Sequence, residues 1–324
     1  MELNLEKVKC LCGEDKANPL TIIHLKNGSE ARIVVCQNCG LRYMSPRPDK
    51  EFLNWMYKEE YYASVINDRD EWEKKTHEHE IWRERIHLYR LKPILKTEDL
   101  YGCRRLLDIG TGAGYFLKLA KDKGFDVIGI EVSERASEFA KKNYGIPVLN
   151  ISGLEKAGFE DSSFDVITLF HVIEHLPSPA NTLKEIYRIL SDKGILVVIT
   201  PNRSAFITIL SRVNRILGYP VKPLEDEYVI KTWEEGCIHF KPKRLDNEGY
   251  IMYLLHNFDH LYFFDAKTLE KLLLRTNFSI SAYPTGGYDY WAKGIRRIFA
   301  SRPINLLARV FNLQKEIMFH ARKT

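Results

Sequence analysis

From residue 104 onward, short runs of apolar residues alternate with segments that are apolar on one side only. The runs are apolar at successive positions, which is typical of strands buried on both faces. Between them, apolar residues recur every three or four positions, which is typical of helices that cover a sheet. The predicted strands are 104–109, 126–132, 164–170 and 194–200, and the predicted helices are 115–124, 134–145 and 181–190. This alternation predicts an α/β domain with a mostly parallel sheet between layers of helices.

The alternation stops at residue 203 and resumes near residue 260. A helix is predicted at 265–278, with Asp265 at its N-terminus, just as Ser133 is expected to cap the helix at 134–145. A strand at 279–283 and a last strand at 316–322 follow. We therefore assign residues 103–324 to one α/β domain and interpret residues 203–259 as an insertion that forms part of a substrate site.

The first 45 residues have a different pattern, with short strand-like runs and two pairs of cysteines. The four thiols belong to Cys10, Cys12, Cys36 and Cys39. Two such cysteine turns are typical of a zinc ribbon, in which four thiolates leave the metal no open position. The first pair is one residue closer than usual, and His24 is an alternative ligand. Residues 1–45 are thus predicted to be a zinc-ribbon-like module, and residues 46–102 a helical linker or cap.

The amino-acid composition excludes only a few classes of function. The 324 residues are 45% hydrophobic and 28% charged, with a formal net charge of +5, which is ordinary for a globular protein. The N-terminal module has no dense cluster of Lys and Arg with interleaved aromatic residues, so no nucleic-acid partner is expected. There is no apolar segment of signal-peptide length at the N-terminus and no run of the ~18 apolar residues that a membrane span needs. These features predict a cytoplasmic protein.

A glycine loop follows the first strand of the α/β pattern. The loop is "DIGTGAG", residues 108–114. We expect the backbone N–H groups at the N-terminus of the following helix to be accessible to a ligand there. A dinucleotide fingerprint would need a glycine in place of Tyr115, and Asp108 would repel a pyrophosphate. Glu131 ends the next strand, where a carboxylate accepts hydrogen bonds from ribose hydroxyls, and Val132 offers an apolar contact for adenine. The loop therefore predicts a pocket for a cationic adenosine compound, and S-adenosylmethionine fits.

Several segments resemble, in order and spacing, the motifs of class I S-adenosylmethionine-dependent methyltransferases. Residues 106–134 resemble the first two motifs, and residues 162–202 the fourth and fifth strands of the branch whose fourth strand ends in Glu-His-Leu. Residues 259–278 resemble the stretch before the penultimate helix of that branch. The resemblance implies a Rossmann-like fold with a mostly parallel seven-stranded sheet and helices on both faces.

The resemblance also implies roles for individual residues. It assigns Asp108 to the methionine end of the donor, Glu131 to the ribose and residues 152–155 to the adenine. The complete expected donor pocket consists of Asp108, Gly110, Thr111, Gly112, Gly114, Tyr115, Glu131, Val132, Gly153, Leu154, Phe170 and His171. The cysteine segment with the following "MSPRP" resembles the N-terminal zinc-binding segment of some of these methyltransferases, including ones that act on sugars.

The segment "HVIEH" at 171–175 ends a predicted strand beside the donor pocket. His175 is the first candidate for a general base, because an imidazole titrates near pH ~6.5. His171, Glu174 and His175 are also suitable ligands for a divalent metal, and ubiquinone-pathway O-methyltransferases carry a similar stretch. A role in bracing the loop, centred on Glu174 and His175, is the third interpretation. His260 is the second candidate for the base.

The expected acceptor is a small molecule, such as a sugar, another secondary metabolite or a lipid-linked compound. Two basic amphipathic segments, 204–218 and 294–311, are interpreted as packing on their own domain, with peripheral membrane contact as the alternative. The competing functions are an RNA methyltransferase that grips RNA through the zinc module and a non-catalytic S-adenosylmethionine-binding module.

Overall fold

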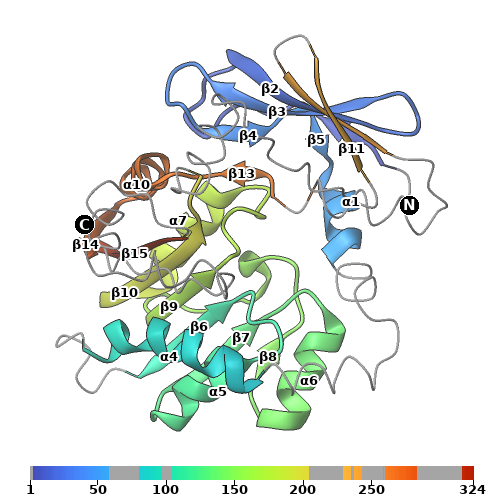
Figure 1. Cartoon of the computed structure of the whole chain (residues 1–324). Helices are drawn as coiled ribbons and strands as arrows, with labels where there is room; N and C mark the ends of the chain where they lie inside the picture. The colour runs from blue at the N-terminus through green and yellow to red at the C-terminus, as the bar shows by residue number, and fades with distance from the viewer. Residues whose placement is uncertain are drawn as a thin grey trace, which may run out of the picture. The chain divides into compact units, whose positions relative to one another are not determined.

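The chain folds into an N-terminal unit and an α/β unit. The computed structural model describes residues 3–57, 80–96, 104–203, 229–234, 237–242, 258, 260–282 and 316–324, and Figure 1 shows their elements. The α/β unit takes in residues 54–200, 270–284 and 318–324. The N-terminal unit takes in residues 1–53, 201–269 and 285–317.

A seven-stranded sheet forms the centre of the α/β unit. In spatial order, its strands are β14 (Phe278–Ala282), β15 (Glu316–Lys323), β10 (Leu190–Pro201), β9 (Phe164–Phe170), β6 (Arg105–Ile109), β7 (Asp126–Ile130) and β8 (Val148–Leu149). The five strands from β10 to β8 pair in parallel, whereas β14 and β15 pair antiparallel. The predicted Rossmann-like fold with a mostly parallel seven-stranded sheet is therefore confirmed.

Helices lie between the strands along the chain. They are α4 (Glu80–Leu95), α5 (Tyr115–Asp122), α6 (Glu134–Tyr144), α7 (Pro179–Ile189) and α10 (Ala266–Arg275), with a short 3-10 helix, η3 (Leu154–Lys156). Ser133 caps α6, because its Oγ accepts a hydrogen bond of 3.3 Å from the N–H of Ala136. At the start of α10, Asp265 accepts a hydrogen bond of 2.8 Å from the N–H of Thr268. Both predicted caps are confirmed.

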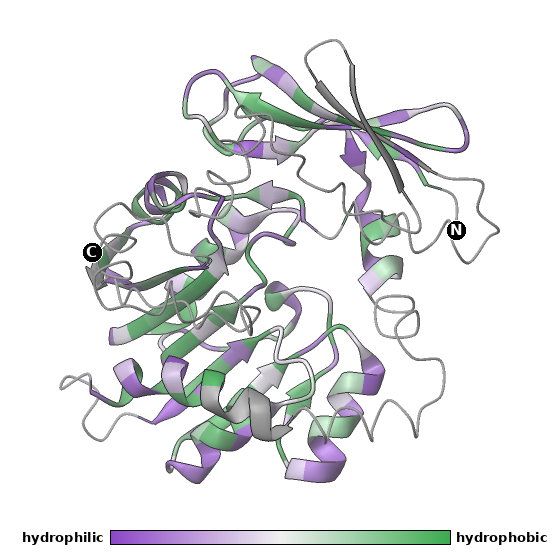
Figure 2. Cartoon of the chain, viewed as in Figure 1, coloured by the Kyte–Doolittle hydropathy of each residue, from purple (hydrophilic) through white to green (hydrophobic). Residues whose placement is uncertain are grey.

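The central strands are buried on both faces, as their continuous apolar sequence predicts. All side chains from Val166 to Leu169 in β9 and from Leu196 to Ile199 in β10 are 0% exposed. Figure 2 shows hydrophobic residues along these strands and hydrophilic residues on helices such as α6. Leu91 and Ile94 of α4 belong to the same core as Leu106 of β6. This packing fixes where each strand ends, and so where the loops after the strands lie.

The N-terminal unit is built on a six-stranded sheet. Its strands, in order, are β11 (Val229–Glu234), β12 (Cys237–Pro242), β2 (Ala17–His24), β3 (Glu30–Cys36), β4 (Arg42–Met44) and β13 (Tyr262–Phe263). A separate pair, β1 (Leu5–Glu6) with β5 (Arg47–Pro48), precedes α1 (Lys50–Trp55). β12 comes from the predicted insertion and pairs in parallel with β2. The domain boundaries 1–45, 46–102 and 103–324 stay a prediction. The structure shows in addition that a strand from the insertion shares one sheet with strands of the first 45 residues.

Several predictions fall on residues outside the described ranges. They concern the basic amphipathic segments 204–218 and 294–311 and most of the insertion 203–259. Within the described part of the chain, no helix combines the length and the apolarity needed to cross a membrane.

Candidate functional site

The glycine loop turns sharply between β6 and α5. Gly110, Gly112 and Gly114 have positive φ angles of 73°, 55° and 82°, a conformation that glycine adopts without strain. The N–H groups of Gly110 and Thr111 both donate to the carbonyl of Ile130, at 2.8 and 3.1 Å. The loop is therefore tied to the end of β7, and the backbone path requires the alternating glycines of the sequence.

Gly110 also has no room for a side chain. A Cβ atom on Gly110 would lie 2.4 Å from Cγ2 of Val172, in the turn that follows β9. The glycine loop and the turn at 171–175 thus pack directly against each other. Within the α/β unit, this contact places the predicted donor loop beside the predicted catalytic turn.

Asp108 is buried near the end of β6, with 3% of its surface exposed. The hydroxyl of Thr168 donates a hydrogen bond of 2.6 Å to Oδ1 of Asp108. Burial raises the pKa of Asp108 to about 7, although the hydrogen bond from Thr168 and the positive charge of Arg90 act in the opposite direction. A carboxylate in this setting is stabilised by a cationic ligand group beside it.

Glu131 follows β7 and joins that strand to the glycine loop. Its Oε2 accepts a hydrogen bond of 2.8 Å from the N–H of Gly112, and its Oε1 accepts one of 2.9 Å from the N–H of Ser133. Burial raises the pKa of Glu131, against these two backbone hydrogen bonds. Asn150, which the sequence did not single out, donates at 2.9 Å to the carbonyls of both Glu131 and Val132, so the end of β8 is fixed to the end of β7.

The other predicted donor residues lie after neighbouring strands or at their ends. Thr111 and Tyr115 are buried in the glycine loop and the first turn of α5, Gly153 and Leu154 lie at η3 after β8, and Phe170 closes β9. Because β8, β7, β6 and β9 are adjacent and parallel, their carboxyl ends meet at one edge of the sheet. The structure thus gathers the predicted donor set at one edge, while its contact with a donor stays a prediction.

Glu174 is the centre of a polar cluster after β9. Its side chain is 1% exposed, and its Oε2 accepts a hydrogen bond of 2.9 Å from the hydroxyl of Thr200 on β10. Its Oε1 lies 3.7 Å from Nδ1 of His171 and 3.9 Å from Nε2 of His175. Burial opposes the ionisation of Glu174, but the two histidines outweigh it, so the pKa of Glu174 is lowered. The three polar residues of "HVIEH" are therefore in one cluster.

Two residues that sequence reasoning missed extend this cluster. Arg90 on α4 places Nη2 at 2.9 Å from Nε2 of His171. Tyr57, shortly after α1, places its hydroxyl 2.8 Å from Nδ1 of His175, and the two rings meet edge to face with centroids 5.6 Å apart. Arg90 and Tyr57 stand 81 and 118 positions from these partners, and neither belongs to a recognisable motif.

His260, the second candidate for the base, belongs to the N-terminal unit. It directly precedes Leu261, whose carbonyl accepts a hydrogen bond of 2.9 Å from the N–H of Met44. The centroid of its ring lies 6.1 Å from that of Phe263 on β13. Its role as a base stays a prediction.

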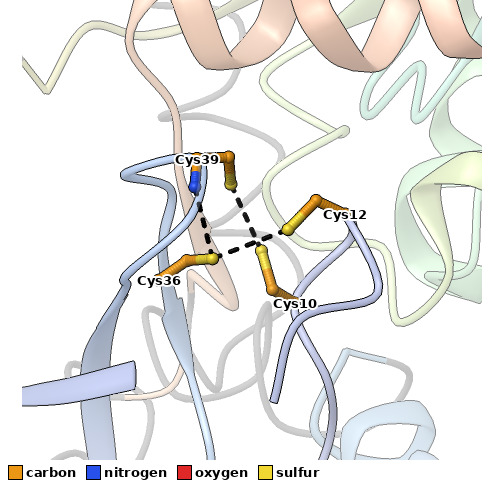
Figure 3. Close-up of side chains that lie close together, drawn as sticks. All are labelled: Cys10, Cys12, Cys36 and Cys39. Atoms are coloured by element: carbon orange, nitrogen blue, oxygen red, sulfur yellow. Dashed lines mark hydrogen bonds between the residues drawn. The ribbon is translucent and has the colours of Figure 1, made fainter. Parts of the chain in front are cut away.

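The four predicted zinc ligands come together in the N-terminal unit (Figure 3). Sγ of Cys10 lies 3.5 Å from Sγ of Cys39, and Sγ of Cys12 lies 3.6 Å from Sγ of Cys36. All four sulfur atoms lie within 4.8 Å of one another. Zn–S bonds of ~2.3 Å in a tetrahedron place the sulfur atoms about 3.8 Å apart. The cluster therefore has the spacing that a tetrahedral zinc ion requires.

The two cysteine turns close in the same way despite their different lengths. The N–H of Cys36 donates to the carbonyl of Leu41, five residues further on, and the N–H of Cys10 donates to the carbonyl of Glu14, four residues further on. In both turns, a glycine with a positive φ angle follows the second cysteine. The shorter C-x-C spacing is thus absorbed by a turn that is one residue tighter.

The alternative ligand His24 lies outside this cluster, with Nδ1 3.3 Å from Oε1 of Glu30. Among the cysteines, burial opposes ionisation of Cys12, but hydrogen bonds from the backbone of Glu14 and from the neighbouring thiols lower its pKa to about 7. The thiolate is the form that binds a metal. Burial raises the pKa of Cys10 and of Cys39, so the fit to zinc rests on the four sulfur ligands and their spacing.

Comparison with known proteins finds similarity to methyltransferases. Residues 64–283, more than half of the chain, match a family model described as a methyltransferase domain. A probable S-adenosylmethionine-dependent methyltransferase of Mycolicibacterium smegmatis is 34% identical over 103 residues, which are 32% of this chain and 40% of the relative. A ubiquinone biosynthesis O-methyltransferase of Glaesserella parasuis is 30% identical over 156 residues, 45% of this chain and 61% of the relative.

The chain thus spans between 40% and 61% of the length of these two relatives. Among solved structures, it is similar to a SAM dependent methyltransferase from Archaeoglobus fulgidus, with a TM-score of 0.46 and 19% identity. That match covers 77% of this chain and 99% of the other.

Proposed function

The chain belongs to the methyltransferase-domain family, and from this premise we propose that it transfers the methyl group of S-adenosylmethionine to a hydroxyl group of a small molecule. The observation that carries the proposal is the pair of buried acids around the glycine loop. Asp108 and Glu131 lie at the ends of adjacent parallel strands, and the loop between them packs on the turn that holds His175.

The donor pocket follows from the chemistry of these groups. Asp108 holds the ammonium group of the methionine moiety, and Glu131 accepts hydrogen bonds from the ribose hydroxyls while it stays anchored to Gly112. The backbone of the glycine loop can approach the donor closely, because its alternate positions carry no side chain. The apolar side chain of Leu154 packs against the adenine. Nothing in this set suits a diphosphate.

The bound donor supplies an activated methyl group on a sulfonium, so the protein has mainly to align the acceptor for an in-line displacement. A hydroxyl acceptor must lose its proton as the methyl group arrives. Nε2 of His175 faces Glu174, and Nδ1 faces the hydroxyl of Tyr57. The acceptor proton therefore passes to the oxygen of Tyr57 as the phenolic proton passes to Nδ1 of His175. The imidazolium is stabilised by the carboxylate of Glu174.

A small-molecule acceptor is favoured over RNA. The net charge of +5 is spread over 324 residues, without a basic cluster in the cysteine module. A relative is named a ubiquinone biosynthesis O-methyltransferase, which supports a hydroxyl-bearing small molecule. Sugars and lipid-linked compounds belong to the same proposed class. A non-catalytic donor-binding module is the second candidate.

A structural zinc ion is part of the proposal. The four cysteines would hold it and would cross-link two turns that are 24 residues or more apart in sequence. Because a tetrahedral four-thiolate site has no open position, the metal would stabilise the module rather than take part in methyl transfer.

The acceptor class is tested by methyl transfer from a donor labelled in its methyl group into a cell extract that has been separated into RNA and small molecules. We expect label in the small-molecule fraction. Label in RNA alone would overturn the acceptor assignment, and no label in either fraction would favour the non-catalytic module.

The proton relay is tested with the acceptor so identified. His175→Ala and Tyr57→Phe should each lower turnover by ~10²-fold and leave donor affinity within about threefold. If both variants keep turnover within about twofold of the parent, His175 is not the base.

A further inference from the structure

Arg90 and His171 make a hydrogen bond whose direction is fixed by chemistry. Nη2 of Arg90 lies 2.9 Å from Nε2 of His171. An arginine guanidinium carries only donors and stays protonated at every physiological pH. Nε2 of His171 must therefore be the acceptor, so its single ring proton sits on Nδ1. This is the neutral Nδ1–H tautomer.

The Nδ1–H group has a carboxylate as its neighbour, at a distance longer than a hydrogen bond. Nδ1 of His171 lies 3.7 Å from Oε1 of Glu174, whose other oxygen already accepts from Thr200. Glu174 is 1% exposed, and the neighbouring His171 favours its ionised form and lowers its pKa. Arg90 thus acts on Glu174 through the tautomer of His171.

The backbone at His171 shows that this arrangement is enforced. Its φ angle is 58°, in the left-handed region that residues with a side chain seldom adopt. Such a conformation is strained and persists only where the surroundings hold it. The carbonyl of Ile199 accepts the N–H of His171 at 2.8 Å, while Nε2 of the side chain is held by Arg90. The turn after β9 therefore has one defined path.

That path is part of the donor site. Val172, directly after His171, occupies the space where a side chain on Gly110 would lie. The guanidinium of Arg90 lies 5.1 Å from the ring centroid of Phe170, a predicted donor residue, and is itself buried. Its positive charge also favours the ionised form of Asp108. Arg90 thus contacts the turn and acts electrostatically on the acid that would hold the donor.

We propose that Arg90 is a positioning residue for the donor site, which holds His171 as the Nδ1–H tautomer and thereby fixes the turn 171–175 against the glycine loop. The identity of the donor, S-adenosylmethionine, is taken from the proposed function. The proposal assigns His171 to a brace and not to metal ligation, since one ring nitrogen accepts from a cation and the other faces Glu174.

The tautomer is measured directly by nitrogen-15 NMR of protein labelled at the histidine rings. The His171→Asn variant identifies the signals of His171 and suits the left-handed backbone. We expect the parent protein to show His171 as Nδ1–H and neutral at pH 7.5. An Nε2–H tautomer or an imidazolium in the parent protein would overturn the proposal, whatever the variants show.

Arg90→Met removes the hydrogen-bond donor to His171, and Arg90→Lys keeps a cationic hydrogen-bond donor. In Arg90→Met, we expect loss of the Nδ1–H signature and about tenfold weaker binding of S-adenosylhomocysteine in calorimetry. Arg90→Lys should retain the tautomer and bind within about threefold of the parent. The matched control is Arg105→Met, which breaks an ion pair with Asp165 at the amino ends of β6 and β9 and should change neither readout.

The outcomes separate this proposal from the proposed function. An unchanged tautomer in Arg90→Met contradicts the role of Arg90, and a lost tautomer with unchanged affinity contradicts the link to the donor. If Arg90→Met does not fold, the parent spectrum and Arg90→Lys decide. If the parent shows the expected tautomer but binds no S-adenosylhomocysteine, the brace stands and the donor assignment fails.

Discussion

The carboxylate of Glu131 accepts a hydrogen bond of 2.8 Å from the backbone N–H of Gly112, which joins the end of β7 to the middle of the glycine loop. The other oxygen accepts from the N–H of Ser133, at the start of α6. One side chain thus satisfies two backbone donors that would otherwise be left without a partner inside the protein. Glu131 is therefore important for the fold as well as for the proposed ribose contact.

Glu131→Gln should separate these two roles. The amide keeps one acceptor oxygen but places an NH₂ group against the second backbone N–H. We expect a loss of about 1–3 kcal/mol in the free energy of unfolding, and donor binding at least ~10-fold weaker. Urea unfolding and calorimetry with S-adenosylhomocysteine measure both. Unchanged affinity in the folded variant would show that Glu131 does not contact the donor.

Gly110→Ala tests the contact between the glycine loop and the turn after β9. The new Cβ would lie 2.4 Å from Cγ2 of Val172, at a φ angle of 73°. Overpacking and backbone strain together should cost about 2–4 kcal/mol of unfolding free energy. Gly158→Ala is the matched control. Gly158 has a φ angle of 65°, but a Cβ atom added there would have no other atom within 4 Å.

The control should lose only about 1 kcal/mol, from strain alone. Equal losses in Gly110→Ala and Gly158→Ala would mean that the packing of Val172 on the loop contributes nothing. The comparison therefore isolates the contact from the conformational preference of glycine.

The cysteine cluster predicts one zinc ion per chain. Elemental analysis of protein purified without added metal should find it, and Cys36→Ser combined with Cys39→Ser should abolish it. Cys103→Ser, which changes a cysteine that is not among the four, should keep the metal. Full zinc content in the double variant would contradict the assignment. Loss of zinc should also destabilise the N-terminal unit, because it opens both cysteine turns.

How far the sequence predicts the molecule depends on how local each signal is. The strands of the central sheet are predictable because burial on both faces leaves a continuous apolar run, as in β9. The donor candidates follow because each stands directly after such a strand, as Asp108 and Glu131 do. Arg90 and Tyr57 are not predictable in this way, because their partners lie 81 and 118 positions away.

The shared sheet of the N-terminal unit escaped prediction for the same reason. Ile238 of β12 pairs with Thr21 of β2, and neither segment carries a signal for its distant neighbour. Because the C-x-C spacing is short, the sequence alone allows His24 to replace a cysteine of the first pair, Cys10 or Cys12, as a zinc ligand. The three-dimensional spacing of the four sulfur atoms favours the cysteines.

The buried carboxyl group of Asp108 should lower the free energy of unfolding at neutral pH. Its pKa of about 7 in the folded protein lies above the ordinary 3.8, so the folded state binds the proton more tightly than the unfolded chain does. The free energy of unfolding should therefore fall as the pH rises from 4 to 7. The total is about 4 kcal/mol, at 1.36 kcal/mol for each unit of pKa.

Asp108→Asn removes this cost and keeps an oxygen that accepts from Thr168. The variant should unfold at a higher temperature than the parent, with a larger difference at pH 8 than at pH 5. A difference that does not depend on pH would mean that Asp108 titrates with an ordinary pKa.

The central claim, that Asp108 serves the site of a cationic adenosine donor, is tested most directly by titrating the parent protein and Asp108→Asn with S-adenosylhomocysteine between pH 6 and 8.5. The ammonium group of the ligand binds the ionised carboxylate, and only about a tenth of the Asp108 side chains are ionised one pH unit below the pKa. We predict that the parent binds about tenfold more tightly at pH 8.5 than at pH 6, and that Asp108→Asn binds weakly across the range. Binding by the variant as tight as that of the parent, or no binding by the folded parent at any pH, would contradict the account.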